Sequence, residues 1–107
     1  MDTIRLMADY ESYPLWWHSG SHVGNLDPAT LPLSSKLVDD LLSWADRYDE
    51  TYNAADPAES GFPSIAAVKS FDAWGEQLWR QLQTELADQY RVVFRRAEDG
   101  MLLEDNV

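Results

Sequence analysis

The sequence predicts an α+β fold in which two amphipathic helices pack on a small antiparallel sheet of two or three strands. Apolar and polar residues alternate with a period of two near both ends of the chain, a pattern typical of half-buried strands. Between these ends, two long segments repeat apolar residues at the spacing of one helix face. Two such helices need a surface to cover, and the apolar face of the sheet supplies it.

The predicted strands lie at residues 3–10 and 90–97, where large apolar side chains occupy every second position. Residues 98–100, with the sequence Glu-Asp-Gly, predict a turn, after which residues 101–103 can return as a third strand. The first and last strands are expected to be neighbours, because either one alone would leave its backbone groups unpaired.

Residues 11–33 are predicted to be an irregular loop, since proline and glycine interrupt them repeatedly. A loop of this length is unusual inside a compact domain and is often functional. Trp16 and Trp17 are consecutive in it. In an extended chain they would point in opposite directions, so one ring can be buried while the other stays accessible.

Serine N-caps predict the starts of both helices. Ser34 or Ser35 precedes a helix that begins near Lys36, and Ser64 precedes one over roughly residues 65–88. Gly75 interrupts the second helix, at a cost of about 1 kcal/mol relative to alanine. We therefore expect a large ring or another backbone to approach the helix closely at this glycine.

The composition fits one folded domain over residues 1–107, with 45% apolar and 12% aromatic residues to build a core. The chain has no cysteine, which excludes disulfides and thiolate chemistry and suits a reducing compartment. Neither a secretory signal nor a stretch apolar enough to span a membrane is visible. We expect a cytoplasmic protein.

The charge is strongly negative, with 19 acidic and 8 basic residues and a formal net charge of -11. Such a field repels nucleic acid and anionic membranes and attracts basic proteins, although it also serves solubility alone. Arg91, Arg95 and Arg96 form the one basic cluster, which is too small for a nucleic-acid footprint. They are expected to pair with Asp9 or with acids on the helices.

No catalytic motif is recognisable, and we expect neither an enzyme nor a bound cofactor. His18 and His22 have a spacing that suits two metal ligands on a helix, but Gly20 between them argues against a helix there. A small metal-dependent enzyme that uses His18 and His22 with Glu11 or Asp27 is one alternative. A non-catalytic regulatory subunit is another.

The surface expected to bind a partner is the acidic outer side of the first helix, continued into the loop that follows it. Carboxylates there would attract a basic protein and speed its association. Trp17 and His18 could add an anchor from the long loop. We expect a monomer or a weak dimer joined through a strand edge. The predicted acidic contacts are Asp39, Asp46, Asp49, Glu50, Asp56 and Glu59.

Several short segments between residues 4 and 90 resemble small bacterial immunity proteins of polymorphic toxin systems, including contact-dependent growth inhibition. The segments are Ile4 to Tyr10, Pro14 to Trp16, Leu31 to Ser34, Leu42 to Ala45, Tyr48-Asp49 and Ser60 to Phe62. The resemblance implies a cytosolic antitoxin that binds and neutralises a cognate toxin domain. Many such toxins are nucleases with basic substrate clefts, so the resemblance implies a basic partner. It implies no particular binding residue, because the recognition residues of immunity families commonly lie outside such shared segments.

Overall fold

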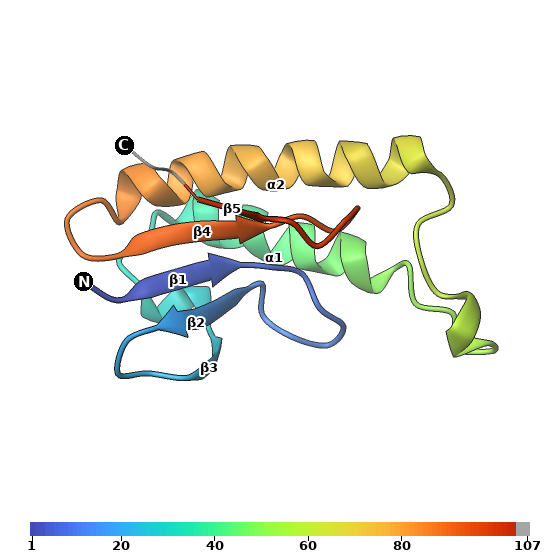
Figure 1. The fold of residues 1–107 in the computed structure, drawn as a ribbon, viewed down its shortest axis with the longest axis horizontal. Helices are drawn as coiled ribbons and strands as arrows, with labels where there is room; N and C mark the ends of the chain where they lie inside the picture. The colour runs from blue at the N-terminus through green and yellow to red at the C-terminus, as the bar shows by residue number, and fades with distance from the viewer. Residues whose placement is uncertain (105–107) are drawn as a thin grey trace.

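The computed structural model describes residues 1–104, and two helices cover one side of a five-stranded sheet in it (Figure 1). The last three residues of the expected domain lie outside the described part. The elements in chain order are β1 (Thr3–Leu6), β2 (Leu15–Ser19), β3 (Gly24–Leu26), η1 (Pro28–Thr30), α1 (Ser35–Asp49), η2 (Pro57–Glu59), α2 (Ile65–Glu85), β4 (Arg91–Arg95) and β5 (Leu102–Leu103).

The sheet has the strand order β3-β2-β1-β4-β5. The neighbours β1 and β4 are parallel, whereas the other three pairs are antiparallel. The predicted α+β class is confirmed, and so is the expectation that β1 lies beside the strand near residue 90. The prediction of two or three antiparallel strands was wrong, because the sheet is larger and mixed. The parallel pair arises because both helices lie in the connection between β1 and β4.

The additional strands, β2 and β3, come from the segment that was predicted to be an irregular loop. They pair as a hairpin in which Leu15 faces Leu26, and both side chains reach the core. The turn between them needs glycine, because Gly20 and Gly24 have φ angles of 109° and 101°. The side-chain amide of Asn25 donates to the carbonyl oxygens of Tyr13 and Leu15, at 2.7 and 2.9 Å, and so ties the hairpin to its approach.

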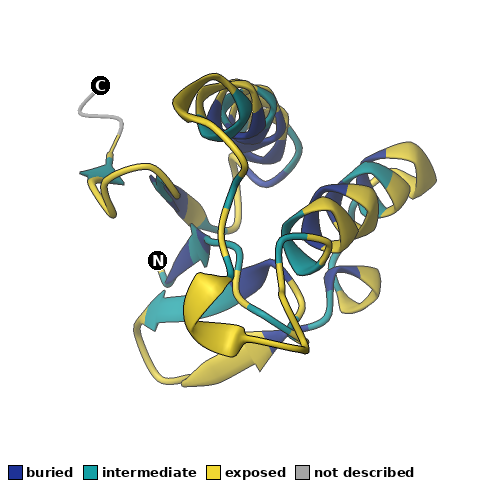
Figure 2. Cartoon of the chain, turned by 90° about the vertical axis from the view of Figure 1, so that its right-hand side faces the viewer, coloured by how far each residue is buried: buried dark blue, intermediate teal, exposed yellow. Residues whose placement is uncertain are grey.

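Both helices lie on the same side of the sheet, with their buried faces turned inward and their exposed faces outward (Figure 2). On the covered side, Ile4, Leu6 and Phe94 are fully buried and Val92 is almost so. These residues occupy every second position of β1 and β4, which places their side chains on one face of the sheet. No helix within residues 1–104 is long and apolar enough to cross a membrane.

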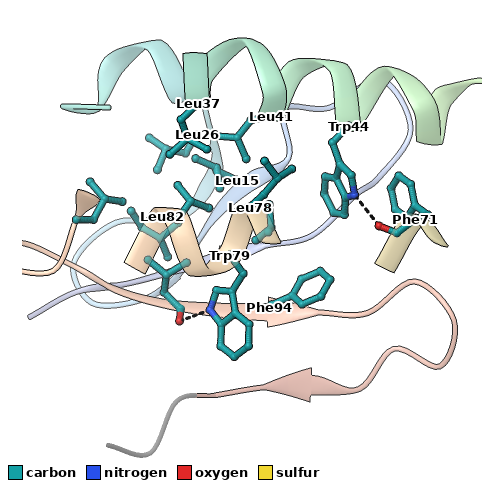
Figure 3. Close-up of a cluster of buried hydrophobic side chains, with 14 residues drawn as sticks. Leu15, Leu26, Leu37, Leu41, Trp44, Phe71, Leu78, Trp79, Leu82 and Phe94 are labelled. Carbon is teal, nitrogen blue, oxygen red and sulfur yellow. Dashed lines mark hydrogen bonds between the residues drawn. The ribbon is translucent and has the colours of Figure 1, made fainter. Parts of the chain in front are cut away.

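Leucines and aromatic rings together fill the core between the helices and the sheet (Figure 3). Trp44 of α1 stacks on Phe71 of α2 with ring centroids 4.5 Å apart and planes within 9°. Its indole nitrogen donates to the carbonyl oxygen of Phe71 at 3.0 Å, and that of Trp79 donates to Val92 at 2.8 Å. Both of these indole N–H groups therefore have a partner, and the Trp44 bond fixes α1 against α2.

Gly75 lies where these rings come closest to α2. A Cβ atom at this position would be 2.8 Å from both the Phe94 and the Trp44 ring, closer than real Cβ contacts allow. The prediction that a large ring approaches the helix at this glycine is confirmed. The cost of glycine in a helix is offset by the approach of the two rings.

The starts of the helices are also those predicted. The hydroxyl of Ser34 accepts a hydrogen bond from the N–H of Leu37, and that of Ser64 accepts one from Ala67. In addition, the carboxylate of Glu85 accepts bonds from the N–H and the hydroxyl of Ser34, at 2.6 and 3.0 Å. The end of α2 is thereby attached to the start of α1.

Candidate functional site

A row of carboxylates runs along the outward face of α1. Asp39, Asp46 and Glu50 follow one another at intervals of seven and four residues, which places them on one stripe of the helix. All three are exposed, and the row extends roughly 16 Å at the usual rise of a helix. Within residues 1–104, Asp39 and Asp46 form no ion pair, and Glu50 has only Arg47 at 3.8 Å.

The predicted loop acids, Asp56 and Glu59, are also exposed and belong to the turn around η2. This turn projects beyond the sheet at the same end of the molecule as the C-terminus of α1 (Figure 1). Two hydrogen bonds close it: the N–H of Gly61 donates to the Thr51 carbonyl at 3.0 Å, and the N–H of Asn53 donates to the Ser60 hydroxyl at 2.8 Å. The structure thus gathers the predicted acids of the loop and of the last turn of α1 at one end.

A hollow of about 380 Å³ opens at this end, between the C-terminus of α1 and the loop that joins β1 to β2. Two tyrosines and two carboxylates line it, from Tyr10, Glu11, Asp49 and Tyr52. Of these residues only Asp49 was among the predicted partner contacts, and Glu11 was named only as a possible ligand of the alternative metal site. The sequence signal that could have found the others is weak: it is a tyrosine with acidic neighbours at Asp9 to Glu11.

Contacts with α1 hold the β1–β2 loop in place beside the hollow. The ring of Tyr10 lies 4.7 Å from that of Tyr48, and its hydroxyl pairs with the Thr51 hydroxyl at 2.8 Å. The N–H of Glu11 donates to Asp49 Oδ1 at 3.1 Å, with Glu11 at a φ of 56°, which is uncommon outside glycine. Burial raises the pKa of Tyr48, so this ring stays neutral in the cluster.

Trp17 and His18 lie elsewhere. The half-buried Trp17 ring packs against His22 and Tyr90, with centroids 4.7 and 5.6 Å away, and it contacts the core. His18 is on the opposite side of β2, where its Nδ1 lies 3.1 Å from Arg5 Nη1. The structure therefore does not bring these two residues together with the acids of α1, and their role as a partner anchor stays a prediction.

The two histidines are separated in the same way, since the ring of His22 contacts Trp17 and that of His18 contacts Arg5. Over residues 1–104, no group of three histidine, cysteine or carboxylate side chains is placed to hold a metal ion. The geometry thus gives the alternative of a metal enzyme at His18 and His22 no support.

The side of the sheet away from the helices carries arginines instead of acids. Arg5 lies over the Trp16 ring at 6.0 Å from its centroid, and burial together with the nearby charge of Arg95 lowers the Arg5 pKa. Arg95 donates to the carbonyl oxygen of Gly100 at 2.8 Å. Neither arginine forms an ion pair with a carboxylate in the described part of the chain.

For Arg96, the expectation of an ion pair with Asp9 or with a helical acid was wrong. Arg96 pairs with Asp99 in its own turn, because the β4–β5 turn brings that carboxylate next to it. The carboxylate of Asp72 in α2 instead accepts the N–H groups of Ala97 and Glu98, at 2.8 and 3.0 Å. This hairpin is therefore attached to the helix through its backbone.

Comparison with protein families assigns the chain. A family model described as Serratia CdiI immunity protein-like matches residues 2–97, nearly the whole length. The chain belongs to this family. Membership confirms the resemblance seen in the sequence, supports an immunity role instead of an enzymatic one, and implies a cognate toxin as partner. No curated protein matches the chain at a significant level.

Proposed function

We propose that this immunity protein-like chain binds one cognate secreted toxin domain, a nuclease with a basic surface, and occludes its active site. The observation that supports the proposal is the gathering of exposed carboxylates along α1 and around η2, in a chain whose net charge is -11. Most of them lack an ion-pair partner within residues 1–104, so their charge is available to another molecule.

Carboxylates suit this task because a nuclease cleft is built to hold phosphates. A row of negative groups at helical spacing can occupy the positions at which the basic side chains of the cleft bind the phosphates of the substrate. The same charges steer the two proteins together before they touch, which raises the association rate. Rapid capture matters for an antitoxin, since a few free toxin molecules can be lethal.

The acidic surface is also rigid. The opposite face of α1 is anchored by Leu37, Leu41 and Trp44, which are all essentially inaccessible to solvent. A surface that is already ordered loses little conformational entropy on binding, so more of the interaction energy appears as affinity. The scaffold therefore holds the carboxylates of α1 ready for a partner.

Charge reversal tests where the toxin binds. Lysine at Asp46, Asp49 and Glu50 together should lower the association rate with the cognate toxin by on the order of 10-fold or more at low salt, and should weaken its salt dependence. The measurement is stopped-flow association at several ionic strengths. Unchanged association and affinity would show that the toxin does not bind at the end of α1.

The matched control places the same three reversals at Asp2, Asp88 and Glu104. These positions belong to the N-terminal end, the α2–β4 connection and the end of β5, which lie at the other end of the molecule from η2 (Figure 1). The control has the same net charge as the test variant. A similar loss in both would mean that only total charge matters, and not the proposed surface.

A further inference from the structure

We propose that the hollow lined by Tyr10, Glu11, Asp49 and Tyr52 receives the side chain of a single arginine from the toxin. The inference rests on the proposed function and names the chemistry that the acidic end recognises. The hollow is the point where the carboxylates of α1 meet aromatic rings in one concave site. A planar cation can stack on the aromatic rings and donate hydrogen bonds to the carboxylates at the same time.

The aromatic walls are held in place before any partner arrives. Tyr10 is fixed by the Tyr48 ring on one side and by its hydroxyl bond to Thr51. Tyr52 meets the Tyr10 ring edge-on at 5.3 Å and leaves about half of its own surface exposed. An exposed ring beside a fixed ring offers a face to a cation at little entropic cost.

The carboxylates of Glu11 and Asp49 can accept further hydrogen bonds from a cation. Asp49 uses Oδ1 to accept the N–H of Glu11, and neither carboxylate forms an ion pair within residues 1–104. The backbone of Glu11 has a positive φ and is tied to Asp49 by this bond, so its side chain projects from an anchored position at the rim. Two carboxylates on the rim would accept the N–H groups of a guanidinium directly.

Among residues 1–104, no basic side chain lines the hollow. Arg47 is the basic residue closest in sequence to Asp49, but it pairs with Glu50 at 3.8 Å. It lines separate hollows with Phe71 and Trp74 and with Asn53 and Phe62. The negative charge at Glu11 and Asp49 is thus left for a group from another molecule.

Arginine fits this hollow better than lysine. Its guanidinium stacks on aromatic faces, donates to two carboxylates from one plane, and is more weakly hydrated than an ammonium group. The volume of about 380 Å³ lies within the range of sites that enclose small groups, so it has room for a single long side chain and water. Arginine and tyrosine are also enriched among the residues that dominate binding energies.

The test measures toxin affinity for Asp49→Asn, Glu11→Gln and Tyr52→Ala. Asparagine keeps the acceptor for the Glu11 N–H and removes only the charge, and Tyr52 has no hydrogen bond through its hydroxyl in the described residues, so folding should survive. Circular dichroism melts check that it does. We expect each variant to bind the toxin roughly 10- to 30-fold more weakly. The control Asp88→Asn removes one charge at the other end of the molecule and should change affinity less than about twofold.

A double-mutant cycle then identifies the occupant. Each exposed arginine and lysine of the toxin is changed to alanine and combined with Asp49→Asn. One arginine should couple to Asp49 by on the order of 10-fold, and lysine there should not restore binding. Coupling to a lysine, or to no residue, would overturn the arginine assignment.

The result also separates the two proposals. Toxin that binds wild-type chain and the Asp49, Glu11 and Tyr52 variants equally well would refute the arginine site and leave the immunity role intact. Toxin that neither binds nor is inhibited by the wild-type chain would refute both.

Discussion

Gly75 and Glu11 are the residues at which the backbone and the packing are most demanding. Gly75 lets the rings of Trp44 and Phe94 lie against α2, where a Cβ atom at residue 75 would clash with both rings. Glu11 takes a φ of 56° because its N–H is held by Asp49. The first could be anticipated, since a glycine in mid-helix is costly and needs a reason.

The partners of Glu11 and Tyr10 could not be anticipated. Asp49 lies 38 residues from Glu11 and Thr51 lies 41 residues from Tyr10, and only the packing of the β1–β2 loop against the end of α1 brings these pairs together. Local patterns carry no information about such contacts. The same reasoning explains why Asp49 was predicted as an exposed acid on a helix, while the hollow beside it was not.

Replacing Gly75 by alanine should destabilise the protein by about 1–3 kcal/mol, because the added methyl group must displace two packed rings. Helix propensity alone predicts the reverse, a gain of about 1 kcal/mol. Urea unfolding measures the difference. Ala73→Gly, at an exposed position of the same helix, is the control and should lose about 1 kcal/mol through propensity. A more stable Gly75→Ala protein would contradict the packing described here.

The helices, β1 and β4 were predictable as elements because each carries a clear period and, for the helices, a capping serine. The hairpin of β2 and β3 was not. Its strands are short, and β2 has tryptophans on both faces, so no alternation of apolar and polar residues marks it. Its glycines and prolines suggested a loop, whereas Gly20 and Gly24 actually form the turn of a hairpin.

The junction between α1 and α2 depends on a carboxylate. Hydrogen bonds, chiefly from the backbone N–H of Ser34, hold the pKa of Glu85 below its ordinary value of 4.5. A carboxylate whose pKa is lower in the folded state stabilises the protein above the unfolded pKa. That stabilisation is lost as the pH falls through the folded pKa.

Glu85→Gln should therefore lower the melting temperature by about 2–5 °C at neutral pH. As the pH falls through the lowered pKa of Glu85, the difference from wild type should disappear, because the protonated carboxyl group resembles glutamine. Melting curves at several pH values provide the measurement. The control Glu59→Gln removes the same charge from an exposed side chain that makes no hydrogen bond within residues 1–104, and should change the melting temperature little at neutral or acidic pH. A difference that persists at acidic pH would mean that charge is not what Glu85 contributes.

At the scale of the whole molecule, charge is unevenly distributed. Five of the predicted acids are exposed along α1 and around η2, whereas Arg5 and Arg95 lie on the sheet face that the helices leave open. Further exposed acids, Asp88, Glu98, Asp99 and Glu104, lie outside this surface. Composition predicted the acidic excess and the position of acids on the first helix. It could not predict that arginines lie on the open face of the sheet, because which strand face stays uncovered depends on the packing of both helices.

This polarity makes the orientation of a complex predictable. A basic toxin would be drawn to the end formed by α1 and η2, and repelled from the arginines of the sheet. The family assignment makes a toxin the expected partner. On the proposal made here, the charge distribution would also set the direction of its approach and speed that approach.

The most direct test of this account is the association rate of the wild-type chain with its cognate toxin domain, measured by stopped flow as salt is raised, with toxin activity followed in parallel. We predict rapid association at low salt, a decrease of roughly 10-fold or more on reaching physiological ionic strength and beyond, and complete inhibition at equal concentrations. An association rate that does not change with salt, or a bound toxin that keeps its activity, would contradict capture and occlusion by the acidic surface.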